Sequence, residues 1–173
     1  WSCAGAASDR SDAVRIMSIH KSKGLEFPVV IVADIAKGFN QLDARGIFLM
    51  HKELGIGPRL VERSDVGRQM YDTLPYQAIA ARIVAETKAE EMRVLYVAMT
   101  RAKEKLVMVH TQANAKSRVA DLLALSDCPV LPEAVDSGKC MGDWIMLPLL
   151  QRSEAASLRE LAGQNGEGSF YAD

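Results

Sequence analysis

Residues 28–35 of the sequence, PVVIVADI, form the apolar run that most constrains the fold. β-branched residues dominate the run, and such residues favour extended strands. The run does not alternate apolar with polar residues, as a strand with one solvated face would. A run of this kind is typical of a parallel sheet with helices on both faces, so we predict a doubly covered central strand in an α/β fold.

Three further segments extend this strand into an alternation of strands and helices. Residues 13–19 alternate apolar and polar side chains enough to favour a second strand. From residue 76 to residue 102 apolar positions recur at helical spacing behind Pro75, which predicts one long helix. Residues 106–110 are rich in strand-forming residues, so strand, helix and strand follow one another as in a parallel sheet.

The segment between the central strand and the long helix is predicted to contain a hairpin insertion. Residues 47–51 and 57–62 flank the sequence KELGI, and Gly55 suits the turn. The charged residues 63–73 are predicted to form an irregular surface loop.

The last third of the chain is predicted to be helical. Residues 119–125 favour a short helix, and the prolines that follow should interrupt regular structure. Residues 141–150 and 155–162 favour a terminal pair of helices, the first bent by Pro148.

Composition and charge limit the classes of protein to which the chain can belong. Hydrophobic residues make up 49% of the 173 residues, enough to bury a core. The chain has 21 basic and 22 acidic residues, so it lacks the basic excess of a typical nucleic-acid-binding protein, and any DNA contact must be local. Its three cysteines show no CxxC pair, which argues against a zinc site or a disulfide framework and indicates a reducing compartment. No apolar run reaches the about 18 residues of a membrane span, so we predict a cytoplasmic protein with no metal site and no membrane partner.

Two arginines lie near the end of the predicted long helix. Arg93, Val97 and Arg101 are spaced four apart and would share one face of that helix. Burying a guanidinium without a counter-charge is costly, so Arg101 should meet an anion, for which a phosphate is the natural candidate. The helix dipole also favours cations in the last turn, so Arg101, Lys103 and Lys105 are equally well explained as ordinary dipole partners. The residues alone leave both interpretations open.

Two long motifs resemble those of superfamily 1 DNA helicases of the UvrD, Rep and RecB group. The segment VRIMSIHKSKGLEFPVVIVADI is similar to their motif V, and EEMRVLYVAMTRAKEKLVMV is similar to their motif VI. Within the group, motif VI and the later SGKCMGDWIMLPLL are most similar to the AddA subunit of AddAB (RexAB) helicase-nucleases. UvrD and Rep usually read EERRLAYVGVTRA, from which Met92, Leu95 and Ala98 depart. The resemblance implies a partial RecA-like second motor domain of the P-loop NTPase type, with a parallel sheet flanked by helices and a hairpin insertion.

The resemblance also implies an activity and a set of partners. The parent protein would be a bacterial ATP-dependent 3′–5′ DNA helicase of double-strand break repair and recombination, with a nuclease domain elsewhere. ATP with Mg²⁺ would be bound mainly by an upstream motor domain of the same parent, because this sequence has no GxxxxGK[ST] loop and no Walker B strand. The chain alone should therefore be inactive. Its expected partners are single- and double-stranded DNA, that upstream domain and an AddB-like second subunit.

Four residues are implied to lie at the nucleotide. Arg101 matches the arginine finger that reaches the γ-phosphate of ATP, and Glu26 matches the motif V glutamate near the ribose. Gly24 would let the backbone approach a phosphate, although a plain turn explains this glycine as well. A salt bridge to a neighbouring lysine would equally explain Glu26. Arg93 belongs to the same cleft, more as an organising residue paired with Glu90 than as a contact to ATP.

Four further residues are implied to lie along single-stranded DNA. His20, Lys21, Ser22 and Lys23 form the polar edge of the loop before the central strand, and short donors at a strand end suit phosphate oxygens. Histidine at this position would also serve to hold its own loop, and the two lysines would also be explained as solvated charges. The predicted helix tyrosine Tyr96 is expected to be packed.

The resemblance divides the chain and leaves two rival interpretations. The expected parts are a disordered lead-in or cloning remnant (1–13), the motor domain with motifs V and VI (14–115), a C-terminal helical extension (116–163) and a flexible tail (164–173). Such a piece of a sheet should expose an apolar edge. The first rival is the same domain of a single-subunit UvrD-, Rep- or PcrA-type repair helicase, which a nuclease domain in the parent would exclude. The second is a non-catalytic partner-binding module, whose mark would be the loss of Arg101, Glu26 or Gly24; all three are present.

Overall fold

The computed structural model describes residues 13–65, 67–127 and 129–163. The strands are β1 (Phe27–Val32), β2 (Phe48–His51), β3 (Gly55–Ser64), β4 (Gly67–Asp72) and β5 (Ala102–Met108). The helices are α1 (Leu74–Met99), α2 (Ala115–Leu123), α3 (Pro132–Ser137), α4 (Met141–Leu149) and α5 (Ala156–Leu161), with short 3₁₀ turns at η1 (Ile19–Ser22), η2 (Leu42–Ala44) and η3 (Ser153–Ala155). Nearly all of the predicted lead-in and the whole predicted tail lie outside the described residues.

The parallel pair β1 and β5 confirms the predicted strand–helix–strand unit. Phe27 pairs with Ala102 at one end of the ladder, and Val32 pairs with Met108 at the other. Parallel strands need a long crossover, which here contains α1. Val32 packs in a buried cluster with Ala98 of α1, so the helix covers one face of the sheet.

Two predictions about this sheet are wrong. Residues 13–18 form no strand, and Val14 and Ile16 are almost fully exposed, because no described strand lies beside them to complete a ladder. β1 is not covered on both faces: Val29 is 51% exposed and Ile31 is 65% exposed. In the described part of the chain both strands of this sheet are edge strands, in agreement with the expected open apolar edge.

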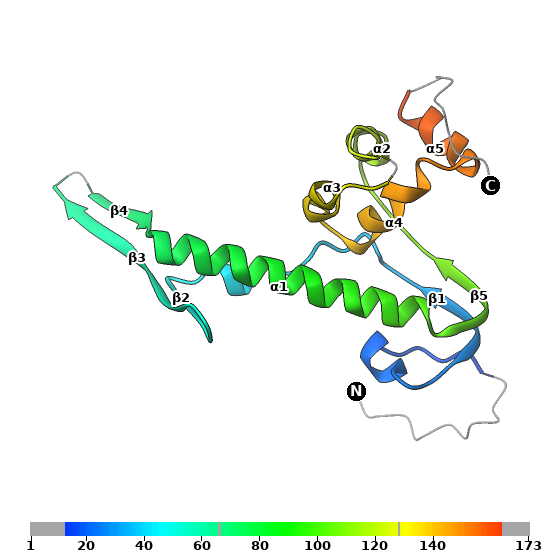
Figure 1. Cartoon of the computed structure of the whole chain (residues 1–173), viewed down its shortest axis with the longest axis horizontal. Helices are drawn as coiled ribbons and strands as arrows, with labels where there is room; N and C mark the ends of the chain where they lie inside the picture. Colours follow the sequence, from blue (N-terminus) through cyan, green and yellow to red (C-terminus); the bar gives the residue numbers. More distant parts are fainter. Residues whose placement is uncertain (1–12, 66, 128, 164–173) are drawn as a thin grey trace.

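β2, β3 and β4 form a second, antiparallel sheet that extends with the first half of α1 as an arm away from β1 and β5 (Figure 1). The hairpin of β2 and β3 confirms the predicted insertion: His51 pairs with Gly55, whose φ of +79° is the left-handed turn conformation expected of glycine there. Gly57 is required for another reason, since a Cβ on it would lie 2.7 Å from the backbone of Tyr76. β3 therefore lies directly against the first turn of α1.

The predicted irregular loop over residues 63–73 is wrong. β3 continues to Ser64, and β4 returns beside it with Arg59 opposite Asp72 and Ser64 opposite Gly67. Every residue of β4 is exposed, so the strand has no buried face and no alternation of apolar and polar residues from which a strand could be predicted. The hydrogen-bonded ladder with β3 holds it in place instead.

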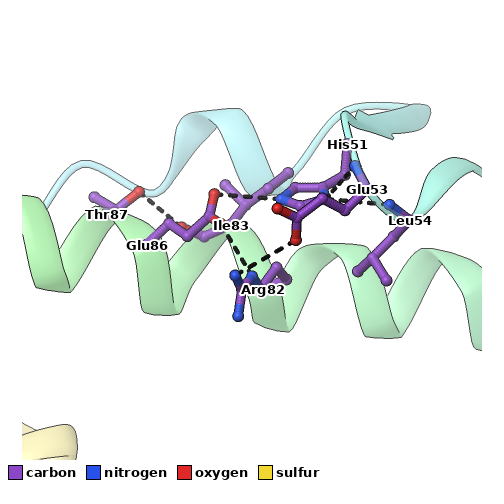
Figure 2. A network of polar contacts seen from close by, with 7 residues as sticks. All are labelled: His51, Glu53, Leu54, Arg82, Ile83, Glu86 and Thr87. Carbon is purple, nitrogen blue, oxygen red and sulfur yellow. Dashed lines mark hydrogen bonds and ion pairs between the residues drawn. The ribbon is translucent and has the colours of Figure 1, made fainter.

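His51 fastens the turn between β2 and β3 to α1 (Figure 2). Its side chain is 5% exposed, and its Nε2 lies 3.3 Å from Oε2 of Glu86. Its Nδ1 accepts hydrogen bonds from the backbone N–H groups of Glu53, at 3.2 Å, and Leu54, at 3.3 Å. A ring nitrogen that accepts carries no proton, so the neutral imidazole carries its proton on Nε2 and donates to Glu86. Arg82 completes the network with a 3.0 Å contact to Oε1 of Glu86.

This network should make the arm sensitive to acid. The hydrogen bond from His51, together with the charge of Arg82, outweighs the opposing effect of burial and lowers the pKa of Glu86 below its ordinary value. A carboxyl with a lowered folded-state pKa stabilises the fold above its unfolded pKa, and this contribution is lost as pH falls through the folded pKa. We therefore expect Glu86→Gln to lower the melting temperature near neutral pH, and the difference from wild type to shrink below about pH 4.

Thermal unfolding followed by circular dichroism at several pH values measures this difference. Glu90→Gln is the matched control, because Glu90 lies on the same helix in an exposed pair with Arg93, remote from the arm. A difference between wild type and Glu86→Gln that stayed constant with pH would refute the role of the ionised Glu86.

The C-terminal helices confirm the terminal pair and the existence of a short helix near residues 119–125, although α2 begins earlier than predicted, at Ala115. α2, α4 and α5 pack around Leu147 and Leu150, which are fully buried. The additional helix α3 was not predicted: it begins at Pro132, where a break was expected, because a proline is tolerated in the first turn of a helix. None of the described helices combines the length and apolar character needed to cross a membrane.

Candidate functional site

The amino ends of β1 and β5 lie side by side, because Phe27 pairs with Ala102. The residues just before the two strands therefore meet. The N–H of Phe27 donates to the carbonyl of Arg101 over 2.9 Å, and Nη1 of Arg101 donates to the carbonyl of Leu25, 76 residues earlier, over 2.9 Å. The two motifs singled out in the sequence thus form one edge of the molecule.

The guanidinium of Arg101 is held by three uncharged acceptors. Besides the Leu25 carbonyl, Nε donates to the carbonyl of Val97 over 3.0 Å, and Nη2 donates to Oγ1 of Thr100 over 3.2 Å. No carboxylate among the described residues forms an ion pair with it. Three of the five N–H donors of an arginine are used in this way, which leaves one on each terminal nitrogen. The site therefore holds a partly buried positive charge that suits an anion.

The predicted shared helix face of Arg93 and Arg101 is wrong. α1 ends at Met99, so Arg101 lies in the turn that leads into β5 and helical spacing no longer sets its direction. Arg93 is 74% exposed and forms a 2.8 Å ion pair with Glu90, which confirms the predicted pairing. Tyr96, predicted to be packed, is also exposed.

Glu26 and Gly24 lie in the loop that Arg101 contacts. Glu26 forms a 3.1 Å ion pair with Lys103, and both side chains are more than half exposed, so this pair contributes little to stability. That contact is the alternative considered for Glu26, while its nucleotide role stays a prediction. Gly24 has a φ of +84°, so the turn by itself requires a glycine here.

Of the four residues predicted to contact DNA, three lie in η1 and Lys23 directly follows it. His20, Lys21 and Lys23 are exposed to solvent. Ser22 is buried, and its hydroxyl donates to the carbonyl of Ile19 over 2.7 Å, so it points into the turn instead of outward. The structure brings these residues to the same loop as Leu25; their contacts to DNA stay predictions.

Two groups that hold Arg101 could not be assigned from the sequence. Every residue has a main-chain carbonyl, so the sequence cannot indicate that the carbonyl of Leu25 is the one that accepts from Arg101. Thr100 appears in the sequence only as a small residue beside Arg101, because its hydroxyl acquires a role only when the helix end and the arginine are placed together.

The α/β fold is consistent with a helicase C-terminal domain, and the chain belongs to the family of UvrD-like helicase C-terminal domains, whose family model matches residues 4–113. It is similar to proteins named as the A subunits of ATP-dependent helicase/nucleases. The identity is 43% over 162 residues with that of Clostridium botulinum Alaska E43, covering 92% of this chain and 13% of the relative. For C. botulinum Loch Maree it is 47% over 154 residues, with 88% and 12% covered. For Desulforamulus reducens it is 42% over 167 residues, with 95% and 13% covered. The chain thus spans about an eighth of the length of these relatives, and the resemblance to the UvrD group is confirmed.

Proposed function

We propose that this chain is the C-terminal motor-domain portion of an ATP-dependent 3′–5′ DNA helicase, an AddA-like helicase-nuclease protein that acts in double-strand break repair and recombination. The observation that carries the proposal is the meeting of Arg101 with the loop before β1 at one edge of the sheet. The similarity to proteins named as ATP-dependent helicase/nucleases supports the involvement of ATP and DNA.

The residues at this edge fit a nucleotide phosphate. Arg101 retains two N–H donors, and no described carboxylate neutralises its charge. When bound, mainly by an upstream motor domain, ATP with Mg²⁺ supplies the phosphoryl group that is transferred to water. Arg101 would contact the γ-phosphate and stabilise the negative charge of the transition state, which is the role of an arginine finger. Glu26 and Gly24 would lie at the nucleotide, and Arg93 would organise the cleft from the neighbouring helix surface.

The exposed side chains of η1 would face the DNA. His20, Lys21 and Lys23 offer donors to backbone phosphates, and Ser22 holds the turn that presents them. The Leu25 carbonyl of the same loop accepts a hydrogen bond from Arg101. A movement of Arg101 would therefore also move the loop that faces the DNA. Such coupling is what a helicase needs to convert ATP hydrolysis into movement along a strand. A cytoplasmic location and an AddB-like second subunit complete the proposal.

Strand separation and ATP binding test this proposal. We expect the full-length parent to unwind a duplex with a 3′ single-stranded tail in the presence of ATP and Mg²⁺, but not one with a 5′ tail. The isolated 173-residue chain should neither unwind DNA nor give calorimetric evidence of micromolar ATP binding, because its sequence contains no phosphate loop. Micromolar ATP affinity of the isolated chain, or unwinding of the 5′-tailed duplex alone, would contradict the proposal.

A further inference from the structure

We propose that Thr100 is a positioning residue for Arg101, which sets the direction in which the guanidinium presents its two remaining N–H donors. Thr100 is the residue at the C-terminal end of α1, directly before Arg101. Its Oγ1 lies 3.2 Å from Nη2 of Arg101, 3.0 Å from the carbonyl oxygen of Tyr96 and 3.1 Å from that of Val97.

The direction of each hydrogen bond around this hydroxyl follows from the chemistry of its neighbours. A guanidinium nitrogen only donates, so Oγ1 of Thr100 must accept from Arg101. A hydroxyl has one proton, and the carbonyls of Tyr96 and Val97 can only accept it. They lie in the last turn of α1, where the Tyr96 carbonyl also accepts from the backbone N–H of Thr100 over 3.0 Å and the Val97 carbonyl also accepts from Nε of Arg101. The helix end thus orients the hydroxyl, and the hydroxyl in turn holds the guanidinium.

The three acceptors around Arg101 fix the guanidinium plane because each holds a different nitrogen. Val97 holds Nε, Leu25 holds Nη1 and Thr100 holds Nη2. Two of the three acceptors are main-chain carbonyls, which a substitution of their side chains leaves in place. Thr100 is therefore the acceptor through which the direction of Arg101 can be changed without altering the backbone or the charge.

The proposal rests on the proposed function, since it gives Thr100 a role in the same ATP hydrolysis. Stabilisation of the transition state by an arginine depends strongly on where its guanidinium is placed. Ground-state binding of the nucleotide by the other domain does not depend on the placement of Arg101. We expect Thr100→Val in the full-length protein to lower kcat for DNA-stimulated ATP hydrolysis about tenfold, with KM for ATP and the affinity for single-stranded DNA unchanged.

Conservative and control variants separate positioning from a general loss of structure. Thr100→Ser keeps the hydroxyl and should restore kcat to near the wild-type value. Thr87→Val is the matched control: the hydroxyl of Thr87 donates to the Ile83 carbonyl over 2.9 Å, the same bond to a residue four positions earlier in α1, but no arginine of the described residues donates to it. Thr87→Val should therefore keep the wild-type kcat. Thr100→Ala, which also lacks the hydroxyl, replaces Thr100→Val if the valine variant does not fold.

The outcomes distinguish this proposal from the proposed function. On an Arg101→Ala background, Thr100→Val should cause no further loss of the residual turnover, because the group that it positions is absent. A wild-type kcat in both hydroxyl-less variants, or an equal loss in Thr100→Ser, would overturn the positioning role even if Arg101→Ala is inactive. A wild-type turnover of Arg101→Ala itself would instead overturn the proposed function.

Discussion

Arg101→Ala in the full-length parent should lower DNA-stimulated ATP turnover by about a thousandfold or more, with single-stranded DNA still bound. The expected loss is large because the guanidinium would act on charge that develops only in the transition state. DNA binding should persist because the bond from Ser22 to the Ile19 carbonyl still holds the η1 turn when the guanidinium is removed. Steady-state phosphate release and fluorescence anisotropy of a labelled oligonucleotide measure the two quantities.

Two variants control this experiment. Arg101→Lys keeps the charge but cannot reproduce the planar fork that contacts Val97, Leu25 and Thr100 together, so it should not restore turnover. Arg82→Ala removes an arginine of α1 at the arm, remote from the amino ends of β1 and β5, and should retain turnover. If Arg101→Ala hydrolysed ATP at the wild-type rate, Arg101 would not be an arginine finger.

Asp143→Ala should reduce the free energy of unfolding by about 3–5 kcal/mol. Asp143 is 1% exposed at the start of α4, and Arg118 of α2 contacts both of its carboxylate oxygens, one of them at 3.0 Å from Nε. The same carboxylate accepts from the backbone N–H groups of Lys139, at 2.7 Å, and Cys140, at 3.2 Å. The substitution would leave a mostly buried guanidinium and two N–H groups without their partner.

The electrostatics of Asp143 agree with this role. Burial alone would raise its pKa, but the hydrogen bonds from Arg118 and from the Lys139 N–H, together with the Arg118 charge, outweigh burial and hold the pKa below its ordinary value. The pKa of Arg118 is raised by the same pair. A carboxyl with a lowered folded-state pKa stabilises the fold above its unfolded pKa, about 3.9, and this stabilisation is lost as pH falls through the folded value.

Urea denaturation followed by circular dichroism measures the cost of Asp143→Ala. Asp136→Ala is the control, since its carboxylate is 78% exposed in an ion pair with Lys88 that should contribute less than about 1 kcal/mol. The double variant Asp143→Ala with Arg118→Met should be more stable than Asp143→Ala alone, because it leaves no unpaired guanidinium. A cost below about 1 kcal/mol for Asp143→Ala would show that the pair does not hold α2 against α4.

The elements with the strongest sequence patterns were correctly predicted because those patterns are local. The existence of one long helix, the hairpin with Gly55 and the strand–helix–strand order depend on neighbouring residues and on the spacing of apolar side chains, although α1 ends at Met99, three residues before its predicted end. β4 and α3 were missed because neither carries such a pattern: β4 is exposed throughout, and α3 begins at a proline.

By itself, the sequence determined the α/β alternation, the two helicase motifs and the membership of the UvrD-like family, because each is recorded in consecutive residues. Only the tertiary structure decided what surrounds Arg101. The parallel register of β1 and β5 brings the Leu25 carbonyl to a residue 76 positions later, and the end of α1 at Met99 separates Arg101 from Arg93. The periodicity of a helix or strand predicts the direction of a side chain only within that element. Arg101, Thr100 and Leu25 lie where elements end, so the pairing of β1 with β5 fixes their positions instead.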